Sequence, residues 1–286
     1  MFRKIALFTL ALFPLTLKAE ENTVFELRTY HANDGKLPAL QSRFRDHTLS
    51  LFEKHGMTNV GYWVPTDNEQ NLLIYLLSYP NKEARDKSWK DFRADEDWKA
   101  AYQASTSDGK LVGKIDSVLL NETDFSNGFN KHKGPARLFE MRTYIAADGM
   151  LPHLHKRFRD HTISIFKKHG MTNLGYFELL DDQKMADSKL IYFLAHQDEE
   201  AARKSWAAFR ADPEWKAVAS ESEKTAGGRI LKKFKSSTKA TDVDSNGDGV
   251  ISDAEHKAYE KTAKAVKPKK AVQSAYLQPV DFSPVQ

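Results

Sequence analysis

The chain has 286 residues, of which 41% are hydrophobic and 11% aromatic, and its formal net charge is +4. This composition excludes a disordered polymer and provides enough apolar surface for one large or two ordinary domains. The chain has no cysteine, which excludes disulfide bonds and thiolate chemistry.

Residues 1–19 have the pattern of a secretory signal peptide. A positively charged start, Arg3 and Lys4, precedes an uncharged run, and acidic residues follow Ala19. The alternative, a membrane anchor, needs about 18 or more apolar residues, whereas this run is shorter and contains Pro14. We therefore expect a secreted or periplasmic protein with no stable membrane span.

Loss of that segment would remove three basic residues and no acidic one, so the mature chain is nearly neutral. It contains no basic stripe interleaved with aromatic residues that could supply phosphate contacts. We therefore expect no nucleic-acid partner, and we expect the partner to be a small molecule or a protein that the sequence does not identify.

Two passages of the chain are nearly identical. "RFRDHTLSLFEKHGMTNVGY" begins at Arg43 and "RFRDHTISIFKKHGMTNLGY" begins at Arg157. The similarity extends outward over residues 24–120 and 137–235, which a linker at 121–136 joins. A period of this length is far beyond that of solenoid repeats, so each copy should be a domain.

Within the first copy, alternation and helical spacing of apolar residues predict six elements. They are a strand at 24–31, a helix at 36–55, strands at 57–65 and 71–79, a second helix that carries Trp89, Phe92 and Trp98 and is broken near 94–96, and a strand at 110–120. The order is β-α-β-β-α-β, the split pattern of ferredoxin-like domains.

In that fold both helices cover one face of a four-stranded sheet, and the other face needs a cover. Residues 72–77 are apolar on both alternations, as expected for a strand that is buried on both sides. We therefore predict an α+β protein in which the sheets of the two copies pack together as an intrachain pseudo-dimer. The alternative is two separate domains on the linker.

Several short motifs recur in both copies or characterise one of them. They are "ELRTY", the Phe-x-x-His helix, "KHGMTNVGYW", and the "FRADPEW" of the second copy, in which Phe177 stands where the first copy has Trp63. Together they resemble the NIPSNAP family of the dimeric α/β barrel superfamily. The resemblance implies two ferredoxin-like βαββαβ repeats that pair as an intrachain dimeric α/β barrel. The resemblance says much less about activity, and two alternatives stay open. One is a ligand-binding or protein-interaction module, and the other is a cofactor-free oxygenase or isomerase that uses the inter-sheet cavity.

If Phe25 and Leu27 face the helices, the polar side chains of both first strands point into the space between the sheets. This polar set is Glu26, Arg28, Tyr30, Glu140, Arg142 and Tyr144. One interpretation is a Glu–Arg ion pair with a tyrosine cap that locks the two halves together. The other is a ligand pocket in which arginine binds an anion while tyrosine or glutamate moves a proton.

His47 and His161 have the helical spacing of the buried stripe. Each is predicted to be a core histidine bonded to backbone, tyrosine or glutamate, or else a ligand, acid–base or haem-facing group. His55 and His169 precede glycines and are read as helix caps. No metal-ligand pattern such as His-x-x-x-His accompanies these histidines on one helix. The chain also lacks a Gly-rich phosphate loop and a Gly-x-Ser-x-Gly nucleophile, which argues against the common hydrolase and nucleotide chemistries.

After the second copy the chain reads "DVDSNGDGVISDAE", which resembles an EF-hand calcium loop. The oxygen ligands would be Asp244, Asn246, Asp248, the Val250 carbonyl, Ser252 and Glu255. Gly249 permits the sharp turn, Ile251 tethers the loop, and Glu255 closes it with two oxygens. An acidic turn without metal is the alternative.

The loop and its exiting helix span residues 242–266, and no second loop exists to pair with it. We therefore expect a structural calcium site with weak affinity, on the order of 0.1 to 1 mM, and not a regulatory switch. Residues 267–286 lack periodicity and are predicted to form a flexible tail or, alternatively, a docking peptide.

Overall fold

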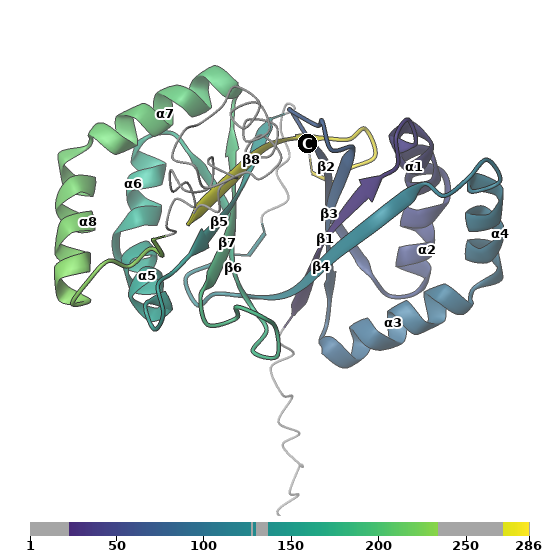
Figure 1. Ribbon diagram of the computed structural model, residues 1–286, viewed down its shortest axis with the longest axis horizontal. Helices are drawn as coiled ribbons and strands as arrows, with labels where there is room; N and C mark the ends of the chain where they lie inside the picture. Colours follow the sequence, from purple (N-terminus) through teal and green to yellow (C-terminus); the bar gives the residue numbers. More distant parts are fainter. Residues whose placement is uncertain (1–22, 127, 130–136, 234–270, 286) are drawn as a thin grey trace, which may run out of the picture.

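The computed structural model of the chain describes residues 23–126, 128–129, 137–233 and 271–285 (Figure 1). The predicted signal peptide, the predicted calcium loop and part of the predicted linker lie outside these residues. Repeat 1 contains β1 Val24–Ala32, α1 Leu37–Arg43, the π-helical turn η1 Phe44–Thr48, α2 Leu49–Lys54, β2 Thr58–Pro65, β3 Leu72–Tyr79, α3 Lys82–Ala94, α4 Glu96–Ser105 and β4 Val112–Glu122. Repeat 2 contains β5 Leu138–Ile145, α5 Leu151–Arg157, the π-helical turn η2 Phe158–Thr162, α6 Ile163–Lys168, β6 Thr172–Leu179, β7 Lys189–His196, α7 Glu199–Ala211, α8 Pro213–Thr225 and β8 Val272–Pro279.

Local chemistry sets the helix boundaries of repeat 1. Pro38 lies in the first turn of α1, where its missing N–H is not needed. Gly56 ends the helix with a φ of +78°, a conformation that glycine adopts without strain. Asn81 caps α3 by accepting from the Ala84 N–H at 2.8 Å, and Asp95 caps α4, so the predicted break of the second helix is confirmed.

The eight strands form one closed barrel in the order β1-β3-β2-β8-β5-β7-β6-β4. Each repeat contributes four strands, and the two sets meet where β2 pairs with β8 and β4 pairs with β6. The helices of repeat 1 lie on one side of the barrel and those of repeat 2 on the opposite side (Figure 1). The predicted α+β fold and intrachain pseudo-dimer are confirmed, and the alternative of two separate domains is wrong.

Large apolar side chains fill the interior of the barrel. Trp63, Phe139, Phe177 and Phe193 are fully buried there, and the Trp63 and Phe193 rings stack with centroids 5.5 Å apart. Gly61 makes room for the indole, because an added Cβ at this position would collide with the Trp63 ring. Burial of each such side chain contributes on the order of 1.5 to 3 kcal/mol, so the two sheets share an apolar core.

Each repeat has a second core between its sheet and its helices. In repeat 1 the rings of Tyr62 and Tyr75 stack 5.3 Å apart, and in repeat 2 Tyr176 and Tyr192 stack 5.2 Å apart. The strands β3 and β7 are therefore buried on both faces.

Residues 272–279 form β8, which takes the fourth-strand position of repeat 2 beside β5. The prediction of a flexible tail is therefore wrong for the described part of residues 267–286, and repeat 2 is not complete at residue 235. β8 is held because Leu277 is fully buried in the barrel interior and because its backbone pairs with both β5 and β2.

Residues 234–270 separate this last strand of repeat 2 from its helices. The backbone N–H of Lys232 donates to the Ile145 carbonyl at 2.9 Å, and the Ala271 carbonyl accepts from the Ile145 N–H at 2.7 Å. The two ends of the intervening segment thus lie beside one residue. In repeat 1 the chain runs from Leu111 directly into β4. The predicted calcium loop therefore belongs to an insertion within repeat 2 and does not follow the repeat.

A short motif after the last strand of each repeat crosses to the other repeat. The chain reads Asp-Phe-Ser at 124–126 and again at 281–283. The second aspartate accepts two hydrogen bonds from Arg45 of repeat 1, both at 2.8 Å, and the first accepts one from Arg159 of repeat 2 at 2.6 Å. The two serines accept backbone N–H bonds from β2 and β6. The halves are therefore tied reciprocally.

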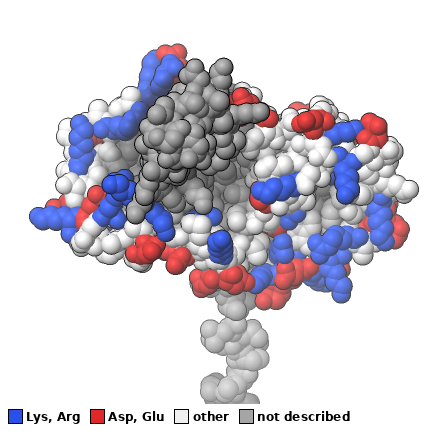
Figure 2. All heavy atoms as spheres, in the orientation of Figure 1, with Lys and Arg blue, Asp and Glu red and all other residues white. Residues whose placement is uncertain are grey.

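The described surface carries both signs of charge. Basic and acidic side chains are interspersed over the visible face of both halves (Figure 2). No helix within the described residues is long and apolar enough to cross a membrane.

Candidate functional site

The polar side chains of the two first strands point toward the helices. Phe25 and Leu27 belong to the interior core of the barrel, so the alternate residues of β1 face outward, and β5 repeats this arrangement. The outward set is Glu26, Arg28 and Tyr30 in repeat 1 and Glu140, Arg142 and Tyr144 in repeat 2. The predicted convergence of these six groups between the sheets is wrong. Alternation separates the two faces of a strand, but it does not identify the inner face when both faces are buried.

Glu26 is the centre of a hydrogen-bond network between β1 and α3. Its buried carboxylate accepts from Arg85 at 2.7 and 2.9 Å, from Arg28 at 2.6 Å and from Trp89 Nε1 at 2.7 Å. Hydroxyl groups on β3 and β4 complete the set. The predicted Glu26–Arg28 ion pair exists, but both residues lie on β1. Arg85 and Trp89 join the pair to α3 of the same repeat, so the network does not lock the two halves together.

Burial alone would raise the pKa of Glu26. Hydrogen bonds from Arg85 and Ser117 and the charge of Arg28 outweigh burial and lower the pKa from 4.5 to about 2. The carboxylate therefore stays ionised near neutral pH while its lone pairs are occupied. This arrangement suits a structural charge cluster and not proton transfer to a substrate.

Repeat 2 keeps the glutamate and changes its partners. Glu140 accepts from Arg142 at 2.6 Å and from Trp206 Nε1 at 2.7 Å, and it lies 3.0 Å from Nε2 of the buried His196. Ala202 occupies the position of the second arginine of repeat 1. Burial alone would raise the pKa of Glu140, but the His196 hydrogen bond and the Arg142 charge outweigh burial, so the pKa lies below its usual value. The second cluster thus has one permanent positive charge where the first has two.

Both histidines predicted on the buried stripe, His47 and His161, are exposed. They lie in π-helical turns, in which the Leu49 N–H donates to the Phe44 carbonyl five residues earlier. A π-turn rotates the chain less per residue than an α-helix does, so Thr48 takes the buried position. The prediction that these histidines belong to the core is therefore wrong. Each lines a surface pocket, so the alternative of a ligand, acid–base or haem-facing group stays a prediction.

His55 and His169 lie at the C-caps of α2 and α6. Their rings contact Asp95 at 2.7 Å and Asp212 at 2.6 Å, and each aspartate caps the start of a later helix. Hydrogen bonds from Lys54 and His55 hold the pKa of Asp95 well below its usual value. These histidines tie helix ends together.

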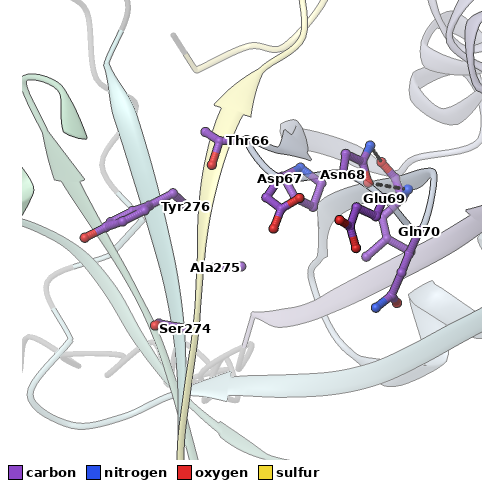
Figure 3. Close-up of a pocket in the computed structure, with 10 residues that line it drawn as sticks. Thr66, Asp67, Asn68, Glu69, Gln70, Ser274, Ala275 and Tyr276 are labelled. Atoms are coloured by element: carbon purple, nitrogen blue, oxygen red, sulfur yellow. Dashed lines mark hydrogen bonds between the residues drawn. The ribbon is translucent and has the colours of Figure 1, made fainter. Parts of the chain in front are cut away.

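One end of the barrel carries a pocket of about 420 Å³, between the β2–β3 connection and strand β8 (Figure 3). Asp67 and Glu69 project from the connection toward β8. Ala275 faces the pocket, whereas Tyr276 points away from it (Figure 3). The pocket is therefore polar on the side of the connection and apolar on the side of the strand.

The equivalent connection of repeat 2 closes the same end of the barrel. Neighbouring strands are antiparallel throughout, so β2 and β6 run in the same direction and finish at one end. Gln183 accepts from the Leu119 N–H at 2.8 Å and donates to its carbonyl, and Ala186 packs against the interior core. In repeat 1 Asn68 instead bonds both backbone groups of Leu72, at 2.7 and 3.0 Å, and the shorter connection leaves the pocket open.

Within the described residues no group of three or more histidine, aspartate or glutamate side chains could hold a metal ion. The predicted calcium ligands lie outside these residues. They are Asp244, Asn246, Asp248, Val250, Ser252 and Glu255.

The family model described as NIPSNAP matches residues 25–127 and 139–238, one match for each repeat. The chain belongs to the NIPSNAP family. It is similar to a solved NIPSNAP domain protein from Burkholderia xenovorans, with 22% identity, 36% of this chain and 96% of that chain covered, and a TM-score of 0.32. Comparison with curated proteins finds no match.

Two solved structures, each called a putative monooxygenase, span both repeats of this NIPSNAP chain. The protein from Lactobacillus acidophilus NCFM is 10% identical over 91% of this chain and 94% of that chain, with a TM-score of 0.51. The protein from Fusobacterium nucleatum is 11% identical over 92% of this chain and 94% of that chain, with a TM-score of 0.52. At these identities the likeness shows the fold alone.

Sequence reasoning missed several residues of these NIPSNAP repeats. Arg85 and His196 belong to no motif. Their only signal is that the other copy has a different residue at the equivalent position, Ala202 for Arg85 and Tyr79 for His196. The Asp-Phe-Ser motif offered a signal that was available: its second occurrence places the fourth strand of repeat 2 just before it.

Proposed function

We propose that this protein is an exported NIPSNAP-type binding module whose ligand site is the pocket at the barrel end. The observation that supports this proposal is the contrast between a filled interior and an open end. Large aromatic side chains occupy the space between the sheets, whereas about 420 Å³ are free beside β8. Pockets of this size suit small molecules.

The lining of the pocket favours a polar ligand that carries a positive charge. Asp67 and Glu69 are the charged groups among its described lining residues, and Thr66 and Gln70 add hydrogen-bonding groups. Ala275 contributes apolar surface on the opposite side. A small amine, or a neutral molecule that donates hydrogen bonds, would complement this arrangement.

A cofactor-free oxygenase or isomerase is the second candidate. The fold shared with the two putative monooxygenases supports it at the level of architecture. Such an enzyme was expected to use a polar cavity between the sheets, and the described residues place apolar side chains there. The binding module is therefore the better supported of the two.

We also propose that residues 244–255 bind calcium and that the ion orders the insertion and not the barrel. Both ends of the insertion lie beside Ile145, so the insertion is a closed loop. The free-energy cost of closing a loop, which is entropic, changes by only about 0.6 kcal/mol when the length of the loop doubles. Ordering part of it should therefore change the stability of the barrel little.

The pocket is tested by NMR on the ¹⁵N-labelled mature chain with small primary amines, neutral amides and carboxylates. Amines and amides should shift the backbone signals of residues 66–70 and 274–276 more than carboxylates do. The double variant Asp67→Asn, Glu69→Gln should weaken amine binding, whereas the matched control Asp181→Asn, on the equivalent connection, should not. Amine binding that survives the double substitution would reject this site, and oxygen uptake that depends on a bound fragment would support the second candidate.

The calcium site is tested by calorimetric titration of the wild type and of Glu255→Gln. Glu255 would supply two of the roughly six to eight oxygens, so the variant should lose most of its affinity. Equal calcium uptake by both proteins would reject the ligand assignment.

A further inference from the structure

Arg43 is a buried cation that lacks an acidic partner. It ends α1, only 5% of its surface is exposed, and its hydrogen-bond acceptor among the described residues is Ser105 Oγ at 3.2 Å. Its Nε has no partner there. Burial lowers the pKa of Arg43, and the neighbouring tyrosines offset only part of this effect. Because a buried charge is unfavourable unless it is paired, this guanidinium is short of an anion.

The Arg43 side chain borders a pocket of about 350 Å³ beside α4 and the start of β4. The rings of Trp98 and Tyr102 lie against the guanidinium, with centroids 5.2 and 5.4 Å from Cζ. Lys110 and Lys114 also line this pocket, and none of its described lining residues is acidic. The one acidic group that Lys114 contacts, Asp116, also lies 2.9 Å from Nε2 of His31.

The rim of the same pocket is apolar and open to solvent. Tyr102 and Ile115, which are 45% and 47% exposed, are the large hydrophobic residues that stand out on the described surface, and both line this pocket. A buried cation below an exposed apolar rim is complementary to an amphipathic anion.

We propose that the Arg43 pocket binds a small organic acid with one carboxylate head and an aliphatic or aromatic body. The head accepts the hydrogen bonds for which Arg43 has too few partners, because a guanidinium matches a carboxylate with two parallel bonds. Lys110 and Lys114 attract the acid, and its body covers Tyr102 and Ile115.

The equivalent arginine of repeat 2 provides a matched control. Arg157 is 4% exposed and lies 5.5 Å from the Trp215 ring. Asp160 and Glu221 line its groove, and the charge of Glu223 offsets part of the lowering of the Arg157 pKa by burial. This groove already holds acidic groups and should not select an anion.

Decanoate is the probe, with decanol as its uncharged counterpart, and binding is followed on the full mature chain by tryptophan fluorescence and ¹⁵N NMR. Decanoate should bind saturably and shift signals of residues 98–115. Arg43→Met should weaken this binding at least about tenfold, the effect of losing hydrogen bonds to a charged group. Arg157→Met should leave the affinity within about twofold.

A second variant keeps the test decisive if Arg43→Met fails to fold. Ile115→Ser removes apolar rim without disturbing the buried arginine, and it should weaken decanoate binding severalfold. Undiminished binding to Arg43→Met, an equal loss in Arg157→Met, or equal affinity for decanol would overturn the proposal. So would the absence of saturable binding at concentrations on the order of 1 mM. The two pockets share no lining residue, so this test and that of the barrel-end pocket fail independently.

Discussion

Repeat 1 and repeat 2 share a fold and most of their helix motif, and they differ where charge is buried. Two arginines neutralise Glu26, whereas one arginine and His196 surround Glu140. The Arg43 pocket lacks acidic groups, whereas the groove beside Arg157 contains them. The apolar positions thus determine the common shape, and the polar positions give each half its own chemistry.

The largest difference between the repeats is the position of β8 in the chain, and removing β8 should have the largest effect on stability. A chain that ends at residue 270 lacks β8, buried Leu277 and the second Asp-Phe-Ser motif. Losing one buried leucine alone removes about 2 to 5 kcal/mol, so we expect this chain to lose cooperative unfolding. Thermal unfolding followed by circular dichroism would measure the loss.

The control for that truncation keeps β8 and removes the insertion. Because Lys232 and Ala271 both bond to Ile145, a short Gly-Ser linker can replace residues 236–268. This variant should unfold within about 1 kcal/mol of the wild type, the scale of a loop-length change. A truncated chain as stable as the control would contradict the role assigned to β8.

The charge clusters allow a sharper comparison of the repeats. Glu26→Gln leaves Arg28 and Arg85 without their buried carboxylate and should destabilise the protein by about 3 to 5 kcal/mol. Glu140→Gln leaves one arginine, Arg142, without its buried carboxylate and should therefore have a smaller effect. Urea unfolding of both variants measures the difference, and equal losses would mean that the second arginine does not matter.

Acid should act on the same clusters. The pKa of Glu26 is lower in the folded chain than in the unfolded one, so its stabilisation is complete above about pH 4.5 and is lost as pH falls toward about 2. This shift corresponds to about 3 kcal/mol. The difference in unfolding free energy between wild type and Glu26→Gln should therefore shrink from about pH 5 to about pH 2.5. A difference that does not change with pH would show that the Glu26 charge is not responsible.

The smallest expected effects concern the π-helical turns, where the repeats should behave alike. Thr48 is buried and donates to the Arg43 carbonyl at 3.1 Å, so Thr48→Val should destabilise the fold by about 1 kcal/mol. His47 is exposed, so His47→Ala should change stability by less than about 0.5 kcal/mol. A larger effect of His47→Ala in urea unfolding would restore a structural role for this histidine.

The duplicated sequence was enough to predict the fold, because the first copy carries the βαββαβ order and a strand that is apolar on both faces, and the second copy repeats most of it. It could not orient β1. Glu26 and Arg28 resemble an inward polar pair, yet they lie under α3 because Arg85 and Trp89, distant in sequence, supply their partners.

Three other features could not be predicted from the sequence, each for a different reason. A π-turn leaves the residue pattern unchanged and shifts which residue is buried, so the histidines were misplaced. The insertion moved the fourth strand of repeat 2 away from its helices, and local periodicity cannot connect segments on either side of it. The barrel-end pocket depends on the length of the β2–β3 connection, and the Arg43 pocket depends on the lack of acidic lining residues. Neither property produces a sequence motif.

The position of β8 also determines when the molecule can be completed during synthesis. Because N-terminal segments fold first as a chain emerges, repeat 1 presents β2 as an edge that lacks its β8 partner until residues 272–279 are made. Exposed edges of this kind pair with other chains, so an incomplete copy is prone to aggregation. Val285, which is fully buried beside Gly61, extends this dependence to residue 285. An affinity tag is therefore better placed away from β8 and Val285.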